Sequence, residues 1–341
     1  MTRILLTIVI IGTCLPAPRS LAVEKVGGVA VFGTESSLCP SPFESLGLWM
    51  VSTRHLTPEA AAADVESPAL GVTMMDESGN RHSIALDDFF SSLRPERPVI
   101  VHVHGNRITE QEANGRGRFV RGQIGRHMPV EAADFVVFSW PSEKTGILVK
   151  DGRSKARMTE AEGLYLGWLL RELVRREIPV AVIAYSFGCR VTTGALHALA
   201  GGCLSGRSLP GDSIRGAQIP VALVAPALDT DWLGPRGYHG LAGQNISRMV
   251  LLYNSRDAVL KRYWMIERGG HSQALGYTGP RYSPLGYDGS PIPLTVRDCT
   301  ATLGRAHNEV QYYAGSCGGG ALIATLLGEL LSQPAPLPSG E

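Results

Sequence analysis

Beyond its N-terminal region, the sequence contains no apolar run of the roughly 18 residues that a membrane-spanning helix needs. It also lacks a charge excess, because 32 Lys and Arg residues against 31 Asp and Glu residues leave a formal net charge of +1. Nucleic-acid-binding proteins usually carry a clear basic excess, so this balance argues against a nucleic-acid partner. What remains is the composition of a globular protein: 341 residues, 44% of them hydrophobic, can bury a sizeable core.

Cysteine is scarce as well, with six residues in the chain, and none has the Cys-x-x-Cys or Cys/His spacing of a zinc site. We therefore expect no metal. In an oxidising compartment one or two disulfides can form, and Cys299 with Cys317 is the first candidate pair. Buried cysteines that act as small hydrophobic residues are an equally good interpretation.

The N-terminal 22 residues have the features of a secretory signal peptide. Met1–Arg3 is positively charged, Ile4–Leu15 is apolar but short for a membrane span, and Ser20–Ala22 offers small residues for cleavage after Ala22. We expect an exported protein, periplasmic or extracellular, with no membrane span after cleavage. Lipidation at Cys14 and an uncleaved N-terminal anchor remain alternatives.

The remaining chain divides into an N-terminal segment (23–44), one domain (45–331) and a disordered tail (332–341, SQPAPLPSGE). Within the domain, short runs rich in Val, Ile and Leu alternate with amphipathic stretches, which predicts strands buried on both faces and helices between them. This alternation indicates an α/β fold with a mostly parallel central sheet flanked by helices on both faces. The predicted strands are 48–51, 99–103, 135–138, 180–184, 221–224, 249–253 and 293–296.

Helices are expected at 159–176, 191–200 and 321–331. The first begins with a capping-box pattern, Thr159 and Glu162, and the second ends at a pair of glycines. Residues 71–84 resemble a hairpin that turns at Gly79-Asn80, which predicts an antiparallel edge of the sheet.

Active sites of open parallel sheets lie at the carboxyl ends of the strands, so the polar residues that follow each strand are the candidates. Ser186 follows one buried strand and precedes a helix, with small residues two before it (Ala184) and two after it (Gly188). This A-x-S-x-G pattern is close to the G-x-S-x-G of a nucleophile elbow, a turn too tight for larger side chains. We interpret Ser186 as a nucleophile, the alternative being a serine of an ordinary loop.

A glycine-containing loop, His104-Gly105-Asn106, follows another strand. In enzymes with a nucleophile elbow, a loop at this place supplies one amide of the oxyanion hole. The first amide would come from Phe187, directly after the serine, and the second from Asn106 or Gly105, with Asn106 preferred. His104 is better placed to shape this loop beside the substrate than to act as a base.

Two further residues complete a catalytic set in the chain order Ser, Asp, His. Asp257 follows the strand at 249–253 and can orient a histidine, although Asp229 and Asp231 also follow a strand and compete for this role. His307 lies beyond the last strand and is preferred over His271, because no strand separates His271 from Asp257.

With these residues in place, the chain resembles the α/β-hydrolase superfamily and, within it, the bacterial family DUF900. The resemblance covers roughly residues 45–330. It rests on WMVSTRHL (49–56), VIVHVHGNRIT (99–109), FVVFSWPS (135–142), IAYSFG (183–188), VALVAPALD (221–229), LLYNSRDAVL (251–260) and GRAHNEVQYY (304–313). The family's elbow usually has His and Met around the serine, where this chain has Tyr185 and Phe187, so its substrate preference is expected to differ.

The resemblance and the residues together imply covalent acyl transfer with a small-molecule ester or acyl substrate and without cofactors. Tyr185 and Trp140 are expected to line an apolar acyl pocket beside His104. The glycine- and proline-rich stretch 261–293 is expected to cover the site in part, unless it is irregular surface. Two other functions stay open: an exported acyltransferase that uses the same three residues, and a non-catalytic scaffold that binds a partner.

Overall fold

The computed structural model describes residues 47–76, 80–146, 148–266 and 272–332. The expected signal peptide with Cys14, the N-terminal segment at 23–44 and the tail beyond residue 332 lie outside the described residues, as does His271. All described residues belong to one compact unit.

A nine-stranded sheet in the order β3-β2-β1-β5-β4-β6-β7-β8-β9 forms the centre of the described part of the chain. All neighbours from β1 to β9 pair in parallel, whereas β2 pairs antiparallel with β1 and β3. The strands are β1 (Leu48–Ser52), β2 (Gly71–Met75), β3 (Arg81–Ile84), β4 (Val99–Val103), β5 (Asp134–Ser139), β6 (Val180–Tyr185), β7 (Ile219–Val224), β8 (Ile246–Tyr253) and β9 (Leu294–Asp298).

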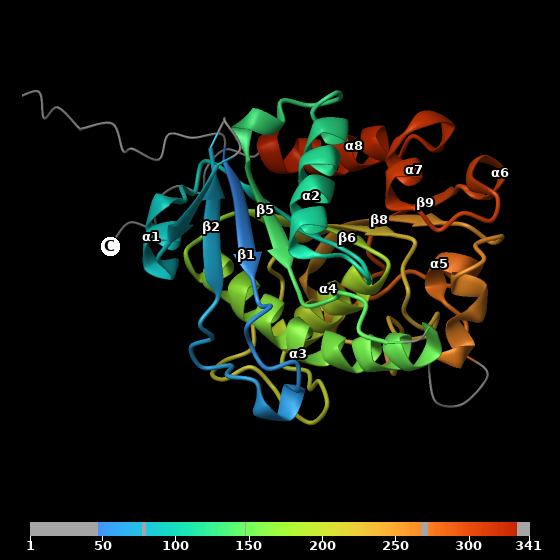
Figure 1. The fold of residues 1–341 in the computed structure, drawn as a ribbon, viewed down its shortest axis with the longest axis horizontal. Coiled ribbons are helices and arrows are strands. Elements are labelled where there is room, and N and C mark those ends of the chain that lie inside the picture. Colours follow the sequence, from blue (N-terminus) through green and yellow to red (C-terminus); the bar gives the residue numbers. More distant parts are fainter. Residues whose placement is uncertain (1–46, 77–79, 147, 267–271, 333–341) are drawn as a thin grey trace, which may run out of the picture. The chain divides into compact units, whose positions relative to one another are not determined.

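Helices cover both faces of this sheet (Figure 1). On one face α3 (Leu148–Arg175) and α4 (Phe187–Leu199) pack against each other and against β6, and on the other α2 (Glu110–Ile124) and α8 (Gly319–Ser332) pack together over β5, β7 and β8. The shorter helices are α1 (Leu86–Ser92), α5 (Leu275–Thr278), α6 (Thr300–Leu303), α7 (Glu309–Tyr313) and the 3-10 turns η1 (Ala60–Ala62), η2 (Val130–Ala132), η3 (Ala242–Asn245), η4 (Leu260–Met265) and η5 (Gly315–Cys317).

The predicted α/β architecture is therefore confirmed, as are the seven predicted strands and the antiparallel edge formed by β2 and β3. The prediction that every run is buried on both faces is wrong for β9. Four of its five residues are exposed, because β9 is the outermost strand and pairs only with β8. Its register with β8 nevertheless places Asp298 beside Tyr253 at the carboxyl edge of the sheet.

The predicted start of a helix at Thr159 is also wrong, because α3 already begins at Leu148. Thr159 lies inside the helix, where its hydroxyl donates a 2.6 Å hydrogen bond to the carbonyl of Ala156 instead of capping a first turn. The Glu162 carboxylate accepts a 2.6 Å hydrogen bond from the hydroxyl of Thr53 and not from a backbone amide at a helix start. A capping box does occur in this fold, at Thr109 and Glu112 of α2.

The expected disulfide joins Cys299 to Cys317 and ties the end of β9 to the turn before α8. Cys189 is a buried thiol and Cys203 an exposed one. Among the described residues, no helix combines the length and the hydropathy that crossing a bilayer requires.

Candidate active site

Ser186 lies at the sharp turn between β6 and α4, in a backbone conformation that few residues adopt, with φ = +52°. The turn needs a very small residue at position 188, because a β-carbon there would lie 2.2 Å from the carbonyl oxygen of Val103. Ala184 is fully buried in β6, so its methyl group is accommodated at the other side of the turn. The local geometry is that of the predicted nucleophile elbow.

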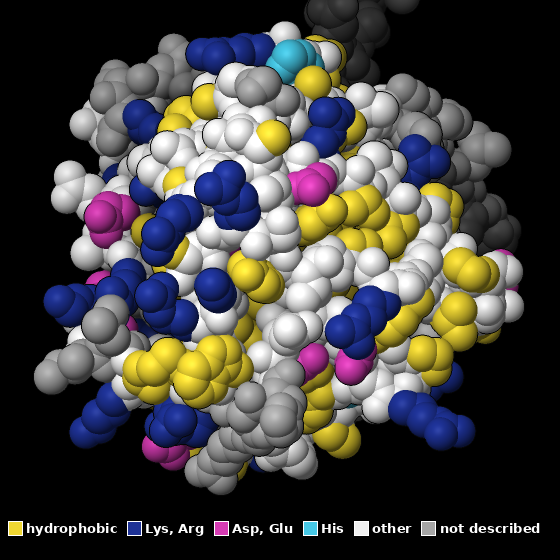
Figure 2. Space-filling model, turned by 90° about the vertical axis from the view of Figure 1, so that its right-hand side faces the viewer, with side chains coloured by type: hydrophobic (Ala, Val, Ile, Leu, Met, Phe, Trp, Pro, Cys, Tyr) yellow, Lys and Arg dark blue, Asp and Glu magenta, His cyan; other side chains and the backbone are white. Residues whose placement is uncertain are grey.

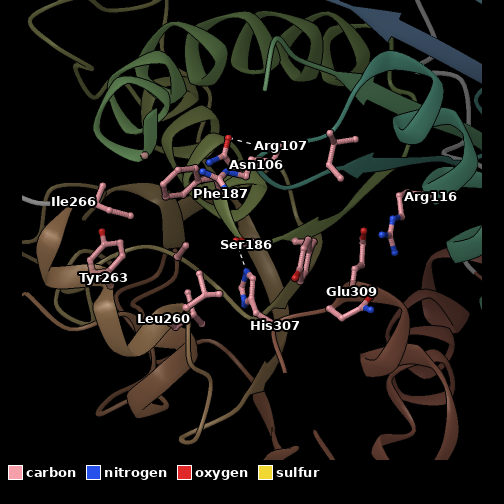
Figure 3. A pocket seen from close by; sticks show the side chains of 16 residues that line it. Asn106, Arg107, Arg116, Ser186, Phe187, Leu260, Tyr263, Ile266, His307 and Glu309 are labelled. Carbon is pink, nitrogen blue, oxygen red and sulfur yellow. Dashed lines mark hydrogen bonds between the residues drawn. The ribbon is translucent and has the colours of Figure 1, made fainter. Parts of the chain in front are cut away.

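The structure brings Ser186, His307 and Asp257 together from three distant parts of the chain. Ser186 Oγ lies 2.9 Å from His307 Nε2 (Figure 3). His307 Nδ1 lies 2.6 Å from Asp257 Oδ2. A carboxylate only accepts hydrogen bonds, so His307 Nδ1 donates to it and Nε2 is left to accept from the serine hydroxyl. This is the tautomer that a general base requires.

Asp257 is held rigidly, since its second oxygen accepts hydrogen bonds from the amides of Val259 (2.8 Å) and Leu260 (2.9 Å) and its side chain is fully buried. The competing Asp229 instead accepts from the amide of Asp231 (3.3 Å), within its own turn. Parallel pairing of β6, β7 and β8 brings the carboxyl ends that precede both aspartates to the same edge of the sheet, and the contact with His307 distinguishes Asp257 from Asp229.

The predicted oxyanion loop lies directly against the serine. A β-carbon at Gly105 would be 2.8 Å from the ring of Tyr185 and 3.2 Å from Ser186 Cβ, so this backbone can approach only because residue 105 is glycine. Asn106 and Phe187 both line the cavity around Ser186, and neither amide donates a hydrogen bond to another described residue. Two amides are thus available beside Ser186 for an oxyanion.

The expectation that His104 and Trp140 line the substrate pocket is wrong. Both side chains are fully buried and lie outside the cavity, stacked with their ring centroids 5.7 Å apart. His104 Nε2 accepts from the amide of Trp140 (3.2 Å), and the Trp140 indole donates to the carbonyl of His104 (2.8 Å). Burial lowers the pKa of His104 well below its ordinary value, so this imidazole is neutral and braces the oxyanion loop.

Tyr185, the third expected pocket residue, does line the cavity. Its ring stacks on the His307 imidazole with centroids 5.2 Å apart and planes at 30°. This stacking contact supports one face of the His307 ring, while its two nitrogens bond Ser186 and Asp257.

A cavity of about 480 Å³ opens over Ser186 and His307 (Figure 3). Leu260, Tyr263 and Ile266 form one side of it, and the last two belong to the beginning of the stretch 261–293, which was expected to cover the site in part. The continuation at α5 packs instead on the loop after β7, where Gly276 lies against Ala225. Partial cover is therefore limited to η4 and Ile266 within the described part of this stretch.

Two cavity residues had no signal of their own in the sequence. Arg116 projects from α2, and Glu309 follows His307 by two residues. The Glu309 carboxylate lies 2.8 Å from His102 Nε2, and both side chains are buried. In the sequence, His102 is only a polar residue inside an apolar run, and Glu309 is only an acid close to His307. The tertiary structure pairs them although they are 207 positions apart.

The surface beside the Asp257 segment is mixed apolar and basic. A shallow hollow there is lined by Arg256, Lys261, Arg262 and Arg305 together with the exposed Trp264. Figure 2 shows the corresponding side of the molecule, where Lys and Arg side chains are more frequent than Asp and Glu and apolar side chains gather in separate patches. No cluster of three His, Cys, Asp or Glu side chains suited to a metal ion occurs in the described ranges.

Comparison with known proteins gives similarities of two kinds, and no curated protein matches significantly. Similar solved structures include TT1662 from Thermus thermophilus (13% identity, 70% of this chain and 90% of that one, TM-score 0.36). Another is esterase B from Lactobacillus rhamnosis, with 12% identity over 83% of this chain and 86% of that one and a TM-score of 0.37. A third is the poly(3-hydroxybutyrate) depolymerase LpqC from Bordetella parapertussis, with 14% identity over 81% of this chain and 88% of that one and a TM-score of 0.39. At these TM-scores the similarities say nothing about activity.

The second kind of similarity is to a family. The model of the family described as alpha/beta hydrolase of unknown function (DUF900) matches residues 84–276, which is more than half of the chain. The matched range includes β4 with its oxyanion loop, the Ser186 turn and Asp257, and it stops before His307. By this match and by its sheet, the chain belongs to the α/β hydrolases of family DUF900.

Proposed function

We propose that this protein is a serine hydrolase that cleaves a carboxylic ester through an acyl-enzyme. The observation that carries the proposal is the continuous hydrogen-bonded series from Ser186 Oγ through the His307 imidazole to the buried Asp257 carboxylate. The geometry matches the nucleophile, base and orienting acid of covalent acyl transfer.

The first half-reaction uses groups that all lie around one cavity. Ser186 Oγ attacks the ester carbonyl while its proton passes to His307 Nε2, and the carbonyl oxygen becomes an oxyanion that the Asn106 and Phe187 amides stabilise. His307 then gives the proton to the departing alcohol oxygen, which breaks the ester bond and leaves the acyl group on Ser186. Asp257 stabilises the imidazolium in between.

The second half-reaction repeats these steps with water as the nucleophile. His307 takes a proton from the water as it attacks the acyl-enzyme carbonyl and returns it to Ser186 Oγ, which releases the carboxylic acid. An ester is favoured over an amide because its alcohol leaves more easily. No step uses a metal or an organic cofactor.

Intact mass after exposure to a fluorophosphonate tests the proposal. We expect one adduct on the purified wild-type protein and none on Ser186→Ala, because an activated serine is phosphonylated and an ordinary one is not. Ser92→Ala is the control and should still be labelled, because Ser92 lies in α1 and its hydroxyl donates to the carbonyl of Phe89. A folded wild-type protein without an adduct would contradict the proposal.

The protein is also proposed to act outside the cytoplasm. Support comes from the charged and apolar N-terminal stretch with small residues before Val23, and from a disulfide between Cys299 and Cys317, which an oxidising compartment favours. Fractionation of expressing cells with N-terminal sequencing tests this. A mature protein that begins at Val23 is expected, and a chain that retains Met1 in the cytoplasmic fraction would contradict export.

A further inference from the structure

The cavity over Ser186 has two sides of different chemistry (Figure 3). Leu260, Tyr263 and Ile266 form an apolar side, and the side chains of Arg116 and Glu309 lie on the opposite side of the serine. An ester has two halves that meet at its carbonyl carbon, so a substrate bound at Ser186 would extend one half toward each side. The two sides therefore select the two halves separately.

The polar side contains buried hydrogen-bonding atoms that the protein does not satisfy. Arg116 Nη1 and Glu309 Oε2 are both buried and have no hydrogen-bond partner among the described residues. Such an unsatisfied group typically costs about 1–3 kcal/mol, so a bound ligand that supplies the missing partners gains affinity there. The other Glu309 oxygen is held by His102 over 2.8 Å, which keeps the carboxylate in place.

The charges of these two residues restrict what the missing partner can be. Arg116 only donates hydrogen bonds and the Glu309 carboxylate only accepts them, so the ligand must offer both an acceptor and a donor. A carboxylate or phosphate on the substrate would suit Arg116 but face Glu309, and an ammonium group would suit Glu309 but face Arg116. Hydroxyl groups meet both demands without adding charge.

The position of Glu309 indicates which half of the ester carries the hydroxyls. The departing alcohol takes its proton from His307 Nε2, and Glu309 lies two residues after His307 in the same segment. We propose that Arg116 and Glu309 form a subsite for the alcohol half of a polyol ester, while the acyl chain occupies the side lined by Leu260, Tyr263 and Ile266. This inference rests on the proposed hydrolase function.

Two butyrate esters with three-carbon alcohols test the subsite, because glycerol monobutyrate differs from propyl butyrate by two hydroxyls. The measured quantity is the ratio of their kcat/KM values on the full-length protein. We expect the wild type to prefer the glycerol ester at least tenfold, and Arg116→Gln to lower this ratio about tenfold or more, as the loss of hydrogen bonds to a charged group implies. A loss of kcat/KM that is equal for the two esters cancels in this ratio.

The matched control is Arg118→Gln, which removes an exposed arginine from the same helix and should keep the wild-type ratio. Glu309→Gln is expected to lower the ratio as well, but its burial against His102 endangers folding, so Arg116→Gln decides. A wild-type ratio near one, or equal ratios in Arg116→Gln and Arg118→Gln, would overturn the proposed subsite. Arg116 and Glu309 would then form hydrogen bonds with water and not with the substrate. Wild-type protein that a fluorophosphonate labels but that cleaves neither ester would overturn it too, whereas absent labelling would refute the hydrolase function itself.

Discussion

The carbonyl oxygen of Val103, the last residue of β4, lies against the α-carbon of Gly188 in the first turn of α4, where any β-carbon would be 2.2 Å away. The same glycine would place that atom 2.7 Å from the carbonyl of His104. This contact brings the loop that carries Asn106 beside the turn that carries Ser186. One backbone approach therefore positions both Ser186, the proposed nucleophile, and the loop proposed to supply an oxyanion amide.

Gly188→Ala should consequently damage both folding and activity. Overpacking of this kind typically costs about 1–3 kcal/mol, and any relief of the clash moves β4 away from Ser186. We expect a lower midpoint in urea unfolding and at least a tenfold slower fluorophosphonate labelling.

Ala184→Gly is the matched variant on the other side of the same serine. It creates the G-x-S-x-G pattern and should cost only about 0.5–1 kcal/mol, the usual effect of glycine inside a strand. Equal behaviour of the two variants would show that the contact with Val103 does not set the geometry of the turn.

Asp257→Asn should remove most of the activity while leaving the protein folded. The amide oxygen of asparagine can still accept from the amides of Val259 and Leu260, but an amide no longer selects the His307 tautomer that accepts from Ser186. We expect kcat/KM to fall about 10³- to 10⁴-fold. Asp231→Asn, a change at an exposed aspartate, is the control, and labelling of Asp257→Asn at a tenth of the wild-type rate or faster would argue against the orienting role.

Glu162 should make the free energy of unfolding depend on pH. Burial raises the pKa of this carboxyl to about 8, against the opposing hydrogen bond from Thr53 and the charges of Arg54 and Lys155. In the unfolded chain it loses its proton near its ordinary pKa of 4.5, so between pH 5 and 8 the unfolded state binds fewer protons than the folded state. Stability then falls as pH rises through this window.

Glu162→Gln removes that dependence, because a glutamine does not titrate. Relative to the wild type, the variant should gain on the order of 4 kcal/mol between pH 5 and pH 8, measured by urea unfolding at several pH values. Glu96→Gln, at an exposed glutamate, serves as the control for the loss of one charge. Parallel pH profiles for the wild type and Glu162→Gln would contradict the raised pKa.

Removal of the Cys299–Cys317 disulfide should destabilise the region after β9. The cysteines are 18 positions apart, and a loop of this size corresponds to a stabilisation of about 3 kcal/mol in the chain-entropy description. The double Cys299→Ala, Cys317→Ala variant should therefore unfold at lower urea concentration. Cys203→Ala, which removes an exposed free thiol, should not change the midpoint, and a similar shift in both would speak against a structural disulfide.

Patterns confined to neighbouring residues were readable from the sequence alone. Continuous Val, Ile and Leu runs predicted the strands, and the small residues around Ser186 predicted the sharp turn, because both depend on local sterics and periodicity. The prediction at Thr159 failed for a related reason. Thr159 and Glu162 have the spacing of a capping box, but both lie inside α3. There the Thr159 hydroxyl donates to the carbonyl of Ala156, and Glu162 accepts a hydrogen bond from Thr53, a residue far away in the chain.

By itself, the sequence determined the fold class, the position of the nucleophile turn and the chain order of Ser186, Asp257 and His307, since each follows a strand that periodicity reveals. Only the tertiary structure decided between Asp257 and Asp229, removed His104 and Trp140 from the cavity, and brought Arg116 and Glu309 to its polar side. The physical reason is that these choices depend on which side chains strand order and helix packing bring within a few ångströms. Contacts between residues far apart in the chain leave no periodic trace in it.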